Sequence, residues 1–396
     1  MWGEEAKLEE HCMAARPEPS ICMPTLRGIW REAFQSGLYE GQDVLAETCD
    51  VDLLELQPGR GFQARDRWLR RLLFRGLSPG LTTMNPGLQK VHLRRDYDLF
   101  IAVCQNFWDL LYINAIEGWQ DRCKTSVCWL GEIWISDLAA CPSLLRKLQR
   151  FDHIFLNNQG TVEPLSRFLD RQCYLLPTAT DTVRFSPFPT PPERSIDVYS
   201  IGRRWEGIHN ALLQAASQRG LFYVYDTYRS MATMELVDYK QHRALLANMA
   251  KRSKCFLVSP GKMNLPGETG GQVEVGYRYF EGAAAGAVMV GQPADCDAFR
   301  EFFPWPEAVI EIRSDGTNVL DVLAKLDADP DRADAIRRRN AAESLVRHDW
   351  VHRWNKIFQV SGVEPSARMR AREAHLKSLA GRALQTEAGS VIGIRT

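Results

Sequence analysis

The chain has 396 residues, more than one hydrophobic core usually supports, so we expect two domains. Hydrophobic residues make up 45% and charged residues 25%, which are ordinary values for a globular protein. Lys+Arg and Asp+Glu each total 49, and the resulting formal net charge of zero argues against a dedicated nucleic-acid binder.

The N-terminal half alternates between predicted strands and predicted helices. Residues 1 to about 22 show no clear period. Apolar runs predict strands at 51–56, 98–103, 125–130, 153–156 and 173–176. Helical patterns occupy 29–38, 64–75, 107–116 and 164–169. This alternation is typical of a parallel sheet with helical crossovers.

A proline-dense segment at 187–192 separates this half from a second alternation. Strands are predicted at 196–201, 221–225, 255–258, 287–290 and 308–312. Helices are predicted at 208–217, 241–252, 273–286, 319–326 and 332–348, with a further basic helix at 366–377. The sequence therefore predicts an α/β protein with two such halves.

A glycine loop leads into the predicted helix at 273–286, which a buried strand follows. Gly270 and Gly271 precede this helix, and its free N–H groups would favour an anionic ligand. Glu274 and Glu281 are seven residues apart and lie on one helical side, with Arg278 between them. These three residues form either a ligand site or an ordinary surface charge ladder.

The run Tyr-Arg-x-Phe-Glu-x-Ala-Ala-x-Gly at 277–286 resembles the nucleotide-sugar site of group 1 glycosyltransferases. The most similar branch is typified by spore-maturation-type glycosyltransferase-like proteins. The resemblance implies the GT-B fold, in which two Rossmann-like domains face each other across a cleft. It also implies that Glu281 accepts hydrogen bonds from the ribose hydroxyls, with Tyr277, Arg278, Gly270 and Gly271 in the same site.

The resemblance also implies the domain boundaries. Asp181, Phe185 and Pro187 match an interdomain Asp-x-x-x-Phe-x-Pro signature. We therefore expect an acceptor domain at 1–180, a linker at 181–192 and a nucleotide-sugar domain at 193–350. Residues 351–396 are then expected to form helices that cross back to the N-terminal domain, followed by a tail.

Cations follow two predicted strands of the second half. Gly202, Arg203 and Arg204 come directly after the first strand, and arginine forms bidentate bonds to phosphate. The resemblance places the phosphate-binding cation at Arg203 or Arg204, and the alternative is a solvated arginine pair. Lys262 lies just past the strand at 255–258, at the edge where ligands bind in open α/β sheets.

Two carboxylates are candidates for the catalytic chemistry. Glu132 follows an N-terminal strand between tryptophans and is a candidate general base for an inverting transfer, or else a capping residue beside core aromatics. Glu274 is the second candidate. Retaining members of the family carry two glutamates eight positions apart, but eight positions before Glu281 lies Val273. The choice between a retaining and an inverting reaction stays open.

The helix at 64–75 carries five arginines beside a tryptophan and apolar residues. It is either a solvated face or a peripheral membrane contact. We expect no metal, because the pair His348 and His352 lacks a metalloprotease pattern, and we expect no cofactor besides the nucleotide-diphosphate sugar. The expected partners are this donor and a glycan, lipid or small-molecule acceptor, without nucleic acid. The oligomeric state is not predicted.

These observations predict a glycosyltransferase that moves a hexose from a nucleotide-diphosphate donor to an acceptor hydroxyl. One alternative is an epimerase-like GT-B enzyme that acts on the sugar nucleotide itself. Another is a non-catalytic scaffold or coat-like protein with a vestigial site. No signal segment or membrane-spanning run is visible, so we expect a cytoplasmic protein, with peripheral membrane contact as the variant.

Overall fold

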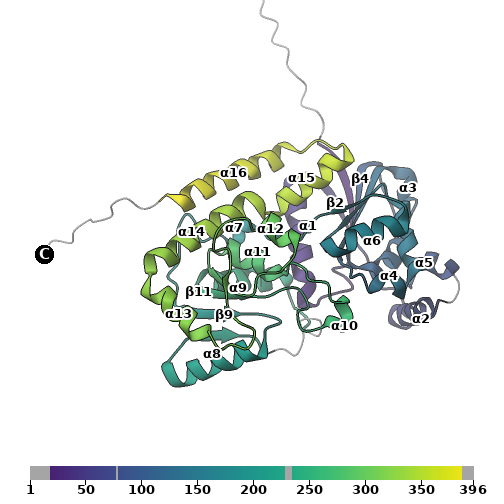
Figure 1. The fold of residues 1–396 in the computed structure, drawn as a ribbon. Helices are drawn as coiled ribbons and strands as arrows, with labels where there is room; N and C mark the ends of the chain where they lie inside the picture. The colour runs from purple at the N-terminus through teal and green to yellow at the C-terminus, as the bar shows by residue number, and fades with distance from the viewer. Residues whose placement is uncertain (1–17, 77–78, 228–233, 386–396) are drawn as a thin grey trace, which may run out of the picture.

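The structure, a computed structural model, describes residues 18–76, 79–227 and 234–385. Figure 1 shows two α/β domains side by side, each built around its own sheet. Every strand pair in the two main sheets is parallel. The connections therefore cross over the sheet faces, mostly through helices.

The N-terminal domain contains a six-stranded sheet in the order β2-β1-β4-β6-β7-β8. Its strands are β1 (Ser20–Thr25), β2 (Asp50–Glu55), β4 (Tyr97–Asn106), β6 (Cys123–Glu132), β7 (His153–Leu156) and β8 (Cys173–Leu175). Along β4, Leu99 and Ile101 pack into one core cluster while Phe100 and Ala102 pack into another. Since successive side chains of a strand point to opposite faces, both faces of this sheet are covered.

The helices of this domain vary in length. They are η1 (Ala33–Gln35), α1 (Ser36–Thr48), α2 (Phe62–Phe74), η2 (Pro79–Thr83), η3 (Phe107–Ala115), α3 (Trp119–Arg122), α4 (Asp137–Ala140), α5 (Pro142–Leu145), η4 (Arg146–Arg150) and α6 (Gln159–Leu169). A two-stranded ladder joins β3 (Val91–His92) to β5 (Ile116–Glu117). The short helix α7 (Thr182–Phe185) lies in the connection to the second domain.

The C-terminal domain contains a five-stranded sheet in the order β10-β9-β11-β12-β13. Its strands are β9 (Ile196–Ser200), β10 (Tyr223–Tyr225), β11 (Ser253–Val258), β12 (Val288–Gly291) and β13 (Ile310–Glu311). Its helices are α8 (Glu206–Arg219), α9 (Tyr239–Lys251), α10 (Pro266–Thr269), α11 (Tyr277–Ala284), α12 (Asp297–Phe302), α13 (Val319–Ala328) and α14 (Pro330–Arg347). Val288 and Val290 join one core cluster and Met289 the other, so this sheet is also covered on both faces.

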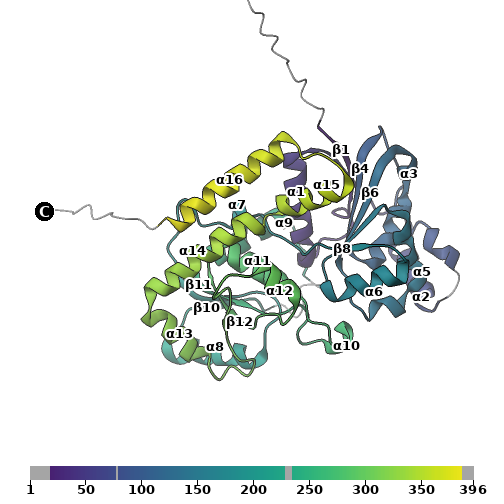
Figure 2. The same ribbon diagram turned by 45° about the horizontal axis from the view of Figure 1, so that its top comes forward.

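The last two helices connect the domains. In α15 (Trp350–Ser361), the Trp354 indole donates to the Gly41 carbonyl of α1 at 3.0 Å, and the Trp350 ring meets the Trp129 ring edge-on at 5.8 Å. The long helix α16 (Ala367–Leu384) then runs back alongside α14 (Figures 1 and 2). Both helices add buried side chains to the core cluster of the N-terminal sheet.

The structure differs from the predicted elements at three places that matter for the site. The strand β1 was not predicted, because Cys22, Met23 and Pro24 do not have the β-branched or aromatic character of a typical strand. The helix predicted at 29–38 starts only at Ser36, because the backbone at 31–33 pairs with residues 234–236 of the other domain. The helix predicted at 273–286 is shorter, since α11 begins at Tyr277.

Candidate functional site

A cavity of about 1170 Å³ lies between the two domains. It is lined from the N-terminal domain by residues at and just after the ends of β4 and β6, together with Phe34 and Phe74. From the C-terminal domain it is lined by loops after β9, β10 and β11. Ligands of open parallel sheets bind outside the carboxyl ends of the strands, and here the strand ends of both sheets contribute to one cavity. We take this cavity as the candidate active site.

The N-terminal wall combines a carboxylate with an amide and aromatic rings. Glu132 ends β6 and accepts hydrogen bonds from the Trp134 indole at 3.0 Å and from the Gln105 amide at 3.4 Å. Gln105 lies at the end of β4 and is only 6% exposed, and its Oε1 has no partner in the described part of the chain. The wall therefore presents the Glu132 carboxylate to the cavity, fixed by an indole donor and an amide donor.

The two adjacent arginines of the C-terminal wall differ in what holds them. Arg204 donates to the Asp226 carbonyl at 2.5 Å, lies 5.5 Å above the Tyr225 ring, and has a side chain only 14% exposed. Arg203 is exposed and donates only to Asn264 Oδ1, at 3.3 Å, within the described residues. Gly202 has φ of +84° and donates its N–H to Asp226. Arg203 is therefore the arginine available to a phosphate.

Lys262 joins the two walls of the cavity. Its ammonium lies 2.5 Å from Glu132 and 2.9 Å from Glu268, and 5.6 Å from the centre of the Trp134 ring. Burial lowers the pKa of Lys262, but Glu132 and Glu268 outweigh it and raise the pKa above its ordinary value. The residue has φ of +48°, a backbone conformation that is uncommon outside glycine. Lys262 is therefore held charged over the cavity.

Glu274 does not lie on α11 with Glu281, as the spacing had suggested. Its carboxylate accepts the backbone N–H groups of Gln159 and Gly160, at 2.9 and 2.7 Å, at the start of α6 in the other domain. It is only 3% exposed, and burial raises its pKa against these hydrogen bonds and the one from Gln272. Glu274 therefore caps a helix across the domain interface and does not line the cavity.

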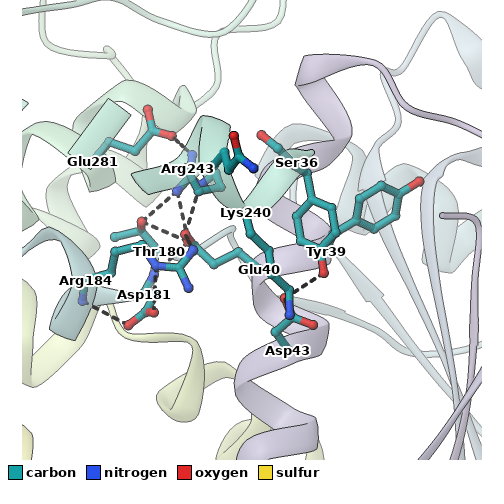
Figure 3. Close-up of polar contacts among 12 residues, drawn as sticks. Ser36, Tyr39, Glu40, Asp43, Thr180, Asp181, Arg184, Lys240, Arg243 and Glu281 are labelled. Carbon is teal, nitrogen blue, oxygen red and sulfur yellow. Dashed lines mark hydrogen bonds and ion pairs between the residues drawn. The ribbon is translucent and has the colours of Figure 1, made fainter. Parts of the chain in front are cut away.

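Glu281 lies in a buried network of charges between the domains. Its two carboxylate oxygens accept from Arg243 of α9 and from Arg278. Arg243 also donates to Glu40 of α1 at 2.9 Å and to the Thr180 hydroxyl at 2.9 Å (Figure 3). Burial would raise the pKa of Glu281, but Arg278 and Arg243 hold it below the ordinary value.

The structure thus divides the predicted site residues into two groups. Glu132, Gly202, Arg203, Arg204 and Lys262 line the cavity. The other group lies in the interface around α10 and α11 and does not line the cavity. Its members are Gly270, Gly271, Glu274, Tyr277, Arg278 and Glu281.

In this second group, Gly270 and Tyr277 make close contacts with the N-terminal domain. Gly270 and Gly271 have φ of +63° and +81°, and a Cβ on Gly270 would approach Ile135 of the N-terminal domain to 3.1 Å. The half-buried Tyr277 packs against Gly37 of α1, where a Cβ would lie 2.9 Å from the Tyr277 ring. A side chain at Gly37 or Gly270 would therefore crowd the opposite domain.

The sequence analysis missed several cavity residues. They are Gln105, Asn106, Asp137, Asp226 and Asn264. The signal for the first two was a pair of polar residues directly after an apolar strand, the same position that identified Glu132. Among the described residues no cluster of three or more His, Cys, Asp or Glu side chains could hold a metal ion. No described helix is long and apolar enough to cross a membrane.

Comparisons with known proteins give a family for part of the chain and a fold for most of it. Residues 194–359 match the family described as "Glycosyl transferase-like". No curated protein matches. Among solved structures, an alpha-glucosyltransferase in complex with UDP-glucose and DNA containing an abasic site has 13% identity and a TM-score of 0.51, covering 87% of this chain and 100% of that one.

Two further solved structures are similar over most of the chain. An alpha-glucosyltransferase in complex with UDP and a 13-mer DNA containing a central A:G mismatch has 13% identity and a TM-score of 0.52, covering 87% of this chain and 100% of that one. The N-terminal domain of Candida albicans trehalose-6-phosphate phosphatase has 8% identity and a TM-score of 0.53, covering 91% and 99%. These matches confirm the predicted fold of two Rossmann-like domains facing a cleft.

The same comparison contradicts the expectation that the protein has no nucleic-acid partner. Transferases with this fold have been solved together with DNA. The exclusion rested on a net charge of zero, which is a total over the whole chain and does not describe how charges are distributed on its surface. A local basic face is compatible with that total.

Proposed function

We infer that the chain is a group 1 glycosyltransferase, and we propose that it transfers a sugar from a nucleotide-diphosphate donor to an acceptor hydroxyl in the interdomain cavity. One observation carries the proposal. The cavity has the exposed cation Arg203 and the charged Lys262 on one side, and the Glu132 carboxylate with the Gln105 amide on the other. Cations suit a diphosphate, and carboxylate and amide oxygens suit sugar hydroxyls.

In this reaction the bond between C1 of the sugar and the diphosphate oxygen breaks, and a bond from C1 to the acceptor oxygen forms. The nucleoside diphosphate leaves with the electron pair of the broken bond, and the acceptor hydroxyl loses its proton. Arg203 and Lys262 are suited to stabilise the charge that develops on the leaving diphosphate. The assignment of Glu281 to the ribose is not part of this proposal, because its carboxylate is engaged by Arg243 and Arg278.

Lys262 links donor binding to the acceptor side of the site. Its ammonium is shared between Glu132 and Glu268. A diphosphate that binds Lys262 competes with Glu132 for the same charge, so donor binding would release the Glu132 carboxylate. A released carboxylate beside the acceptor can take the hydroxyl proton, which is the role of a general base.

The acceptor class includes nucleic acid. The alpha-glucosyltransferases with this fold hold DNA together with UDP or UDP-glucose. This supports testing DNA beside glycan, lipid and small-molecule acceptors. The spore-maturation-type branch remains a proposal based on the run at 277–286.

The test begins with donor binding. Thermal shifts are measured with UDP, GDP, dTDP, CMP and ADP for the wild type and for Arg203→Ala. We expect one nucleotide to raise Tm and the variant to lose most of that shift. The sugar nucleotides of that base are then incubated with candidate acceptors, and release of nucleoside diphosphate is followed. No shift with any nucleotide would overturn the transferase and favour a scaffold, while an altered sugar nucleotide without transfer would favour the epimerase-like alternative.

A further inference from the structure

The exposed side of α2 carries a stripe of arginines flanked by aromatic rings. At 100° per residue, Arg67, Arg71 and the C-cap residue Arg75 are offset from one another by about 40° around the helix axis. Phe74 and Trp68 flank them on either side. All five side chains are exposed, with Trp68 at 50% and Phe74 at 64%. The arginines span about 12 Å along the helix axis. We call these five residues the basic stripe.

The charges of the basic stripe have no carboxylate partners among the described residues. The one acidic residue of α2, Asp66, is buried and pairs with Arg70 at 2.8 Å. Within the described part of the chain, Arg67 donates only to the Gln63 carbonyl of its own helix, at 3.2 Å. Some exposed arginines elsewhere are paired with carboxylates, for example Arg332 with Glu307 and Arg347 with Glu343. An unneutralised row of charges is suited to an external polyanion.

The basic stripe adjoins the candidate active site. Phe74, at its end, is one of the residues lining the cavity. Arg70, on the same helix, places its guanidinium 5.5 Å from the ring of Trp108, another lining residue. An extended polyanion bound along the basic stripe would therefore reach the mouth of the cavity.

A membrane surface fits this helix poorly. An amphipathic helix binds lipid by burying its apolar face in the bilayer. The apolar face of α2 is already occupied, because Phe62, Leu69 and Leu73 are 6%, 1% and 1% exposed within the N-terminal domain. Trp68 and Phe74 remain, separated by arginines. Isolated rings beside cations are typical of surfaces that stack bases and contact phosphates.

We infer that the basic stripe is a docking surface for a nucleic-acid strand. Its arginines contact successive phosphates, Trp68 and Phe74 contact bases or sugars, and the strand presents an acceptor hydroxyl to the cavity. Only this last step rests on the proposed transferase function. Phosphate contacts by arginine fix the position of a strand without reading its sequence.

The test is binding of fluorescein-labelled single-stranded and duplex DNA, followed by anisotropy over a range of salt concentrations. The variant Arg67→Gln/Arg71→Gln/Arg75→Gln removes the three charges. A control, Arg219→Gln/Lys325→Gln/Arg382→Gln, removes three exposed charges from α8, α13 and α16. We expect the stripe variant to lose roughly tenfold or more in affinity and its duplex salt slope to fall by about 3, with the control unchanged.

Equal binding by the two variants, or no binding of DNA by the wild type, would overturn the inference. Co-sedimentation with phosphatidylserine vesicles, measured in parallel, overturns it if the protein binds vesicles and not DNA. Thermal shift with the donor nucleotide shows whether the stripe variant is folded. It also separates the two proposals, because DNA docking without nucleotide binding supports the docking surface while the transferase proposal fails.

Discussion

Two neighbouring arginines of the cavity have different surroundings and should respond differently to substitution. Arg204 is held by Asp226 and stacked over Tyr225, whereas Arg203 is exposed. A charge-assisted hydrogen bond is worth about 1.5–3 kcal/mol, so Arg203→Ala should weaken nucleotide-diphosphate binding by roughly tenfold or more at unchanged Tm. Calorimetric titration measures the affinity. Arg204→Ala is the comparison, and we expect it to lower Tm. Equal affinity of Arg203→Ala and the wild type would contradict the assignment.

Glu281 should contribute mainly to stability. Removing one member of a buried ion pair leaves the remaining charge unpaired and costs about 3–5 kcal/mol. Glu281→Ala leaves both Arg243 and Arg278 without one partner, so we expect the free energy of unfolding in urea to fall by about that amount. Glu343→Ala removes surface pairs to Arg339 and Arg347 and should cost about 0–1 kcal/mol. Similar losses in the two variants would show that the network is not stabilising.

His242 should make the protein less stable in mild acid. Burial first, and then Arg243 and Arg278, lower its pKa from 6.5 to about 4. Between pH about 6.5 and about 4 the unfolded chain binds a proton that the folded chain does not, so stability falls as the pH falls through this window. Because the ring is partly exposed, we expect His242→Gln to reduce the loss between pH 7 and pH 5 by about 1–2 kcal/mol. Urea unfolding at both pH values measures this, and an unchanged loss would contradict it.

At the scale of elements, Glu274 joins the loop before α11 to the start of α6. Glu274→Ala removes two hydrogen bonds and a negative charge from that helix N-terminus. We expect unfolding free energy to fall by about 1–3 kcal/mol, with nucleotide affinity little changed because the residue lies outside the cavity lining. Glu163→Ala, on the exposed side of α6, is the control and should have almost no effect. A loss of nucleotide affinity at unchanged stability would instead support the catalytic role expected from sequence.

Elements with a clear local sequence pattern could be predicted, whereas elements whose position depends on residues far along the chain could not. The strand β7 has the predicted bounds, because His153–Leu156 is an apolar run between turns. The strand β1 lies between β2 and β4 in the sheet, yet its residues are not typical of strands, and its position depends on neighbours far along the chain. The start of α11 was misplaced because helical spacing alone cannot show that Glu274 is bonded to residues more than 100 positions away.

At the scale of the whole molecule, the site residues also differ in whether a local pattern or the packing of the two domains determines their position. The positions of Arg203, Lys262 and Glu132 at the cavity could be predicted because each lies at or just after the end of a strand, and the ends of parallel strands meet at one edge. Arg243 and Glu40 could not be predicted, because on their helices they read as ordinary surface charges. Only the docking of one domain on the other buries them, at 2% and 1% exposure.

The C-terminal helix should stabilise both domains at once. Leu376 of α16 is fully buried in the core cluster shared with the N-terminal sheet, while α16 also packs along α14 of the C-terminal domain (Figure 2). Leu376→Ala leaves a cavity in this shared packing and should lower the unfolding free energy by about 2–5 kcal/mol. The adjacent Lys377 is exposed, so Lys377→Ala should change it by no more than about 0.5 kcal/mol. Urea unfolding followed by tryptophan fluorescence compares the two. Equal small effects would mean that the packing of α16 contributes little to stability.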